Sequence, residues 1–244
     1  MKIEQADVNR REIYRYLGYR GQEPDEMVQS MIDEVLKELL RVVRPAHSYR
    51  YYGCEVIENK VYLLKDERME MELADGESEH TGVHNADEPI QEILSQKLAD
   101  NLAQCEEVIL LAATLGLEAD KLIQRYTVMN MAKASVAQAC GAACIEAYCN
   151  KVQEDIRQEA LERGLYLRPR FSPGYGDLSL DYQKDIFGLL ECNKRLGMSL
   201  TDSMLMLPTK SVTAIIGLTR NKENCHIAKC SVCSKTDCEF RTID

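Results

Sequence analysis

The clearest periodic pattern in the chain is a helical one near the N-terminus. Between Pro24 and Pro45, apolar residues recur every three or four positions, at Met27, Met31, Ile32, Val35, Leu36, Leu39, Leu40 and Val43. Proline and acidic residues open this segment and arginines close it, the order that is typical of helix ends. The pattern therefore predicts an amphipathic helix here. Residues 9–21 contain a shorter helix-like run, which is ended by Gly18.

The next segments change to strand-like patterns. YRYYGCEVIENKVYLL, starting at Tyr49, is rich in tyrosine and valine, and Glu58-Asn59-Lys60 suits the turn of a hairpin. EEVILLAATL, starting at Glu106, is short, apolar and bounded by charges and Gly116, which predicts a buried strand. The acidic segment 65–89 between them predicts an exposed loop or a strand pair.

The remaining elements complete a mixed pattern. Helices are predicted over residues 90–102, over 117–163 as one short and one long helix, and over 181–197 with a stop at Gly197. Residues 198–220 predict two strands joined near Pro208. Helices and strands mix without regular alternation, which predicts an α+β fold with an antiparallel twisted sheet flanked by helices. We expect one domain over residues 1–220 and a Cys-rich tail over 221–244.

Composition narrows the possible partners. The chain has 40 acidic and 30 basic residues among 244, for a net charge of −10, and no basic cluster, so a nucleic-acid partner is not expected. The N-terminus has no apolar core of a signal peptide, and the longest apolar run, Val108 to Leu117, is too short for a membrane helix. We therefore expect a cytoplasmic protein with no membrane partner. No glycine-rich phosphate loop occurs.

Ten cysteines divide into two groups. Six are scattered among apolar neighbours and are expected to be small core residues: Cys54, Cys105, Cys140, Cys144, Cys149 and Cys192. The last four, Cys225, Cys230, Cys233 and Cys238, fall within a short tail whose spacing suits zinc or an iron–sulfur cluster. Free thiols or a redox pair are the alternative. His226 is expected to be an exposed neighbour.

The long predicted helix contains an unusually small-sided stretch, AKASVAQACGAACIEAYC, from Ala132 to Cys149. Small side chains on successive turns let another group approach the helix backbone closely. This pattern indicates either tight packing on a sheet or the wall of a ligand site.

A loop between two predicted helices, RPRFSPGYGDLSL from Arg168 to Leu180, carries the most distinctive chemistry. Pro173-Gly174 is the favoured central pair of a type II turn. An extended approach to this turn would hold Arg170 on the same side as Tyr175. A guanidinium binds a carboxylate and an aromatic face attracts a cation, so the loop suits an amino-acid-like zwitterion. The alternative is that Arg170 pairs with a surface acid and Tyr175 packs. Arg168 is expected to be a surface charge.

Several motifs in this part of the chain resemble one known family. Arg170, Pro173, Gly174 and Tyr175 match an Arg-x-x-Pro-Gly-Tyr loop, Leu200 to Ser203 a Leu-Thr-acid-Ser strand, and Pro208 to Val212 a Pro-x-x-Ser-Val strand. In this order the motifs resemble the activation domain of cobalamin-dependent methionine synthase, over residues 97–218. The resemblance implies a C-shaped α+β module that binds S-adenosylmethionine and presents its methyl group to a corrinoid on a partner domain.

The resemblance also implies roles for individual residues. Arg170 would hold the methionyl carboxylate, the backbone around Phe171 and Ser172 would meet the adenosine, and Tyr175 would line the pocket near the sulfonium. Gly174 of the same turn is counted among the cofactor-binding residues. Family enzymes hold the ligand's amino group with an acid in an N-terminal segment, for which this chain shows no match. They also place a glutamate on the helix before the loop, where this chain has Ala142. Glu146, one turn later, is the candidate for the ammonium contact, and a solvated glutamate is the alternative.

No Asp-x-His-x-x-Gly cobalamin signature occurs in the chain. The resemblance therefore implies a standalone activation subunit that serves a separate cobalamin-binding methionine synthase or another corrinoid protein, with a flavodoxin- or ferredoxin-type reductant. Two other functions are compatible with the sequence. One is an electron-transfer protein acting through a metal in the cysteine tail, and the other is a docking module that has the fold without the ligand.

Overall fold

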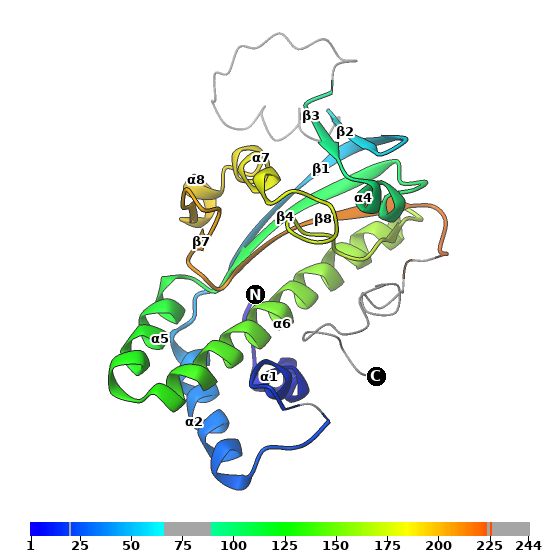
Figure 1. The fold of residues 1–244 in the computed structure, drawn as a ribbon. Coiled ribbons are helices and arrows are strands. Elements are labelled where there is room, and N and C mark those ends of the chain that lie inside the picture. The colour runs from blue at the N-terminus through cyan, green and yellow to red at the C-terminus, as the bar shows by residue number, and fades with distance from the viewer. Residues whose placement is uncertain (20, 66–88, 224, 226–244) are drawn as a thin grey trace.

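The computed structural model of the chain describes residues 1–19, 21–65, 89–223 and 225. A six-stranded antiparallel sheet in the order β3-β2-β1-β4-β8-β5 forms its centre (Figure 1). The strands are β1 (Ala46–Ile57), β2 (Lys60–Leu64), β3 (Gln91–Leu94), β4 (Glu107–Thr114), β5 (Tyr166–Leu167) and β8 (Ser211–Thr219). A separate hairpin pairs β6 (Ser199–Leu200) with β7 (Met206–Leu207).

Helices cover both faces of the sheet (Figure 1). They are α1 (Arg10–Tyr16), α2 (Glu26–Val42), α4 (Gln96–Asn101), α5 (Leu117–Met129), α6 (Met131–Glu162), α7 (Gln183–Leu189) and α8 (Cys192–Leu196), with short 3-10 turns η1 (Gln5–Asp7) and η2 (Leu180–Tyr182). Together with the antiparallel sheet, these helices confirm the predicted α+β class.

The central strand β4 divides the interior into two cores. Its side chains point alternately to opposite faces, as in any strand. Ile109, with Leu111 and Ala113, joins the core beneath α1, α2, α5 and α6. Leu110, with Val108 and Ala112, joins the core beneath α4, α7 and α8. Burial on both faces explains why this strand is continuously apolar in the sequence.

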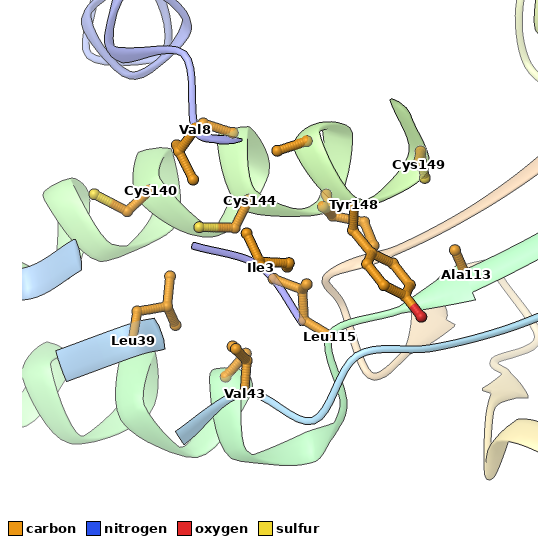
Figure 2. Close-up of a cluster of buried hydrophobic side chains, with 14 of the residues drawn as sticks. Ile3, Val8, Leu39, Val43, Ala113, Leu115, Cys140, Cys144, Tyr148 and Cys149 are labelled. Atoms are coloured by element: carbon orange, nitrogen blue, oxygen red, sulfur yellow. The ribbon is translucent and has the colours of Figure 1, made fainter. Parts of the chain in front are cut away.

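The long helix α6 lies on one face of the sheet, between β4 and β8 and the helices α1, α2 and α5. Its small side chains allow this close packing, and Cys140, Cys144 and Cys149 lie buried among apolar neighbours (Figure 2). Tyr148 ties the helix to β1, because its hydroxyl lies 2.8 Å from Nδ1 of His47. The structure thus accounts for the small-sided stretch by packing, chiefly against helices.

All six scattered cysteines are buried, as predicted. Burial raises the pKa of the Cys54 and Cys140 thiols to about 12, and that of Cys105 and Cys192 to about 11. Neutral thiols of this kind behave as small hydrophobes.

Several predicted elements are confirmed. The helix predicted from Pro24 is α2, residues 117–163 form α5 and α6, and β1 and β2 form a hairpin. The turn of this hairpin is shorter than the predicted Glu58-Asn59-Lys60, since Lys60 already pairs with Ile57. Glu58 in the turn has a φ of 55°. Of the acidic segment 65–89, residues 66–88 lie outside the described residues.

Within the described part of the chain, none of the helices combines the length and apolarity that a membrane crossing requires.

The helix predicted over residues 90–102 is wrong in its first half. Gln91–Leu94 forms the edge strand β3, in which Ile93 pairs with Val61 of β2 and is buried. The helix α4 begins only after Ser95, whose hydroxyl accepts a hydrogen bond from the Leu98 amide. The edge of β2 offers hydrogen bonds that helical periodicity in the sequence does not reveal.

The single helix predicted over residues 181–197 is divided into α7 and α8. Glu191 between them has a φ of 50°, and the freed carbonyl of Leu189 accepts a hydrogen bond from Nη1 of Arg50 at 2.8 Å. Nη2 of Arg50 also pairs with Glu191 at 3.0 Å. A side chain from β1 thus satisfies the break. The predicted stop at Gly197 is confirmed.

Residues 198–220 form three strands in two sheets and not the two strands that were predicted. β6 and β7 pair with each other, whereas β8 lies inside the main sheet between β4 and β5. The link between β7 and β8 is anchored at Thr209, whose amide and hydroxyl both donate to Asp120 of α5 at 2.7 Å. This long-range contact decides where the chain turns.

Candidate functional site

The loop that carries Arg170 runs along the outer edge of β8. After β5, the Arg168 amide donates to the Gly217 carbonyl at 2.8 Å. Phe171 and Ile215 exchange both backbone hydrogen bonds, at 2.9 and 2.7 Å. The backbone on either side of Arg170 is therefore fixed to the rigid sheet.

The predicted turn follows directly. The Tyr175 amide donates to the Ser172 carbonyl at 3.1 Å, and Gly174 has a φ of 89°, as a type II turn at Pro173-Gly174 requires. The Gly174 amide in turn donates to the carbonyl of Leu178 at 2.9 Å, and Leu178 is buried. The loop is closed by its own hydrogen bonds and anchored in the core.

Asp177 attaches the far end of the loop to α4. Its carboxylate accepts hydrogen bonds from the Ser95 hydroxyl at 2.5 Å and from the amides of Gln96 and Lys97 at 2.9 and 3.2 Å. The hydrogen bond from Ser95, with those from the two amides, lowers the pKa of Asp177. The carboxylate caps the positive end of the helix, which stabilises both.

Arg170 is buried against α6. Its Nη1 donates to Gln153 at 2.7 Å, and its Nη2 donates to Asn150 at 2.9 Å and to Glu146 at 3.0 Å. The three acceptors are spaced by four and three residues, so they share one face of the helix. The guanidinium therefore joins the loop to the helix that precedes it.

The other predicted site residues surround this contact. Phe171 is half-buried and packs on the core beneath α7, and Ser172 is also half-buried. Tyr175 is 63% exposed, whereas the Arg170 side chain is only 7% exposed. Of the predicted set, the structure joins Arg170 directly to Glu146. That ion pair matches the first part of the alternative, in which Arg170 pairs with a surface acid, whereas the exposure of Tyr175 does not match its second part, in which Tyr175 packs.

Glu146 lies at the border between α6 and α1. Its side chain is 37% exposed, and it is close enough to Tyr16 of α1 to help raise the pKa of that phenol, after burial as the main cause. The guanidinium of Arg15 lies over the Tyr16 ring at 4.4 Å. The N-terminal segment therefore reaches the candidate site.

Arg168 is not the surface charge that the sequence predicted, since it is only 5% exposed. Its Nη1 donates to the Glu223 carbonyl at 2.5 Å and its Nη2 to the Ala103 carbonyl at 2.9 Å. Both acceptors are backbone carbonyls, which a side-chain pattern in the sequence cannot predict. Arg168 is a structural clamp on the side of β8 where Cys105 lies.

Of the four tail cysteines, only Cys225 belongs to the described residues. It is buried, and its thiol donates to the Asn221 carbonyl at 3.3 Å. Cys230, Cys233 and Cys238, with His226, lie outside the described residues. The described part of the chain contains no group of three or more metal-ligating side chains. The four-cysteine metal site stays a prediction.

The sequence-based set omitted Asn150, Gln153 and Asp177. The first two lie four and seven residues after Glu146, a helical spacing that would have indicated a common polar face. Asp177 follows the turn, but its partner α4 begins some 80 residues earlier in the chain, as the separation of 81 from Gln96 shows. Only the tertiary structure connects them.

A family model and a solved structure are similar to this chain. The family model described as "Vitamin B12 dependent methionine synthase, activation domain" matches residues 26–237. Among solved structures, the crystal structure of the MetH reactivation domain bound to AdoHcy has a similar fold, with a TM-score of 0.59 and 19% sequence identity. The match covers 86% of this chain and 74% of that one. No curated protein matches the chain.

Proposed function

We propose, from the premise that this chain belongs to the family of vitamin B12-dependent methionine synthase activation domains, that its 170–176 loop binds S-adenosylmethionine. The observation that carries the proposal is Arg170, a buried guanidinium held rigidly beside the Pro173-Gly174 turn. A fixed guanidinium is a specific receptor for a carboxylate.

Each part of the ligand has a candidate partner in the loop. Arg170 would bind the α-carboxylate and Glu146 the ammonium group. The backbone of Phe171 and Ser172 would meet the adenosine, and Gly174, with its φ of 89°, would shape the turn of the binding loop. Tyr175, with its exposed ring, would face the sulfonium, because an aromatic face attracts a positive charge.

The role of the chain would be to position the methyl group. A reduced corrinoid on a cobalamin-binding methionine synthase or another corrinoid protein would supply the electron pair that accepts the methyl group, and S-adenosylhomocysteine would be the product left on this chain. The reductant would be a flavodoxin- or ferredoxin-type protein, and the setting cytoplasmic. The residues of this chain hold and orient the donor, so the rate gain would come from proximity.

Calorimetry with S-adenosylmethionine and S-adenosylhomocysteine tests this proposal. Replacing Arg170 with alanine is expected to weaken both by about 10- to 100-fold, since a hydrogen-bonded charge contributes roughly 1.5–3 kcal/mol. The control is Arg157→Ala, which removes an arginine of α6 that pairs only locally, with Glu154 at 2.5 Å. Equal affinity of the Arg170 variant and the wild type, or absence of binding in both, would refute the proposal.

A further inference from the structure

Arg170 has no free pair of parallel N–H groups for a ligand. A guanidinium grips a carboxylate through two parallel donors, either Nη1 with Nη2 or Nε with Nη2. Both pairs require Nη2. In this protein Nη2 donates to Glu146 and Asn150 at once, so its two hydrogens are in use.

The acceptors of Arg170 differ in charge and in access. Asn150 and Gln153 contribute neutral amide oxygens, which hold the guanidinium without cancelling its charge. Glu146 is the charged partner. Its side chain is 37% exposed against 7% for Arg170, so Glu146 has room to swing toward solvent while Arg170 stays fixed.

We propose that Glu146 competes with the ligand for Arg170. When the ligand binds, its α-carboxylate replaces Glu146 at Nη2 of Arg170. Asn150 and Gln153 are positioning residues that keep the guanidinium in place during the exchange. Once released, Glu146 faces the ammonium group of the same ligand. This inference rests on the proposed function and adds a basis for its specificity.

The exchange favours ligands that carry both charges. A zwitterion replaces one ion pair by two, because its carboxylate pairs with Arg170 and its ammonium with Glu146. A ligand with a carboxylate alone displaces Glu146 and gives it no new partner, which costs affinity. A ligand with neither charge leaves the resident pair intact. Glu146 would therefore select the intact amino-acid portion of the ligand.

The test compares two probes on the full chain and on Glu146→Gln. The probes are S-adenosylhomocysteine and its deamino analogue, which keeps the carboxylate and lacks the ammonium. The deamino analogue is expected to bind the variant about fivefold more tightly than the wild type, the effect of removing one partly exposed charge pair. S-adenosylhomocysteine should gain nothing, because the variant also loses the ammonium contact.

Two further variants make the result interpretable. Glu154→Gln is the matched control, since Glu154 lies on the same helix, is exposed and pairs with Arg157. It should leave both affinities unchanged. Glu146→Ala serves as a second variant if Glu146→Gln does not fold. Thermal melting shows whether each of the two variants is folded. Alanine and glutamine are both well accepted inside a helix.

The outcomes separate this inference from the proposed function. If S-adenosylhomocysteine binds the wild type but the deamino analogue does not tighten on Glu146→Gln, the competition is refuted and the proposed function stands. If the probes bind only the variant, Glu146 blocks Arg170 and the proposed function fails for the wild type. If nothing binds to either protein, both fail.

Discussion

At the scale of single residues, two arginines of one loop have different tasks. Arg168 and Arg170 are separated only by Pro169, and both are buried. Arg168 donates to two backbone carbonyls, whereas Arg170 donates to side chains of α6. A carbonyl cannot move away from its donor without moving the chain, but a glutamate side chain can rotate. Arg168 therefore suits a structural role, and Arg170 a site that exchanges partners.

Replacing Arg168 with alanine should lower the free energy of unfolding and leave ligand affinity unchanged. The carbonyls of Ala103 and Glu223 would lose a charged donor, at a cost of roughly 1–3 kcal/mol. Urea denaturation measures the first effect, and calorimetry with S-adenosylhomocysteine measures the second. A stable variant with weakened binding would show that the two arginines act together.

At the scale of elements, Asp177 connects the loop 168–180 to the start of α4. The sequence-based prediction merged β3 and α4 into one helix, and the structure separates them at Ser95. Both Ser95 and Asp177 satisfy amides at the helix start, which would otherwise lack partners. The boundary between strand and helix is thus set partly by a residue of a distant loop.

Replacing Asp177 with alanine should lower the free energy of unfolding by about 0.5–2 kcal/mol, the usual effect of losing a helix cap. Because the pKa of Asp177 is lowered from 3.8, its contribution is present above that pH and is lost as pH falls through the lower value of the folded state. Urea denaturation of the wild type and the variant at pH 7 and below pH 3.8 measures the loss of stability and its dependence on pH.

The control for this change is Asp181→Ala, in the same segment, where the carboxylate accepts a local hydrogen bond from Ser179 at 3.0 Å. If both alanine variants lose the same stability, the cap on α4 is not what Asp177 contributes.

At the scale of the whole molecule, the sheet separates two hydrophobic cores, and β4 contributes buried side chains to both of them. Neighbouring residues of this strand therefore stabilise different layers of helices. Ile109 packs beneath α6, and Leu110 packs beneath α4, α7 and α8. The loop 168–180 lies at the β8 edge of this sheet, where it contacts α6 from one layer and α4 from the other. The position of the loop thus depends on both cores.

Two adjacent substitutions test this architecture. Ile109→Ala and Leu110→Ala should each lower the free energy of unfolding by about 2–5 kcal/mol, because each leaves a cavity in a packed core. A strand with one exposed face would lose stability at only one of the two positions. Leu94→Ala, at a side chain that is 50% exposed, is the control and should change stability little. Urea denaturation compares the three.

The sequence by itself determined the features that depend on neighbouring residues. Apolar spacing located α2, α5 and α6, a continuous apolar run located β4, and Pro173-Gly174 located the turn. These signals are local, because helix periodicity, burial on both faces and turn geometry each act within a few residues. The family motif around Arg170 was visible for the same reason.

Only the tertiary structure decided the features whose partners are distant in the chain. The break between α7 and α8 depends on Arg50, 139 residues from the Leu189 carbonyl that it meets. β3 exists because β2 offers it an edge, and β8 enters the main sheet between β4 and β5. The partner of Arg170 was likewise undecided by sequence, since the choice between a ligand and a surface acid depends on how α6 packs against the loop. Long-range hydrogen bonds and burial made these decisions, and no local pattern encodes them.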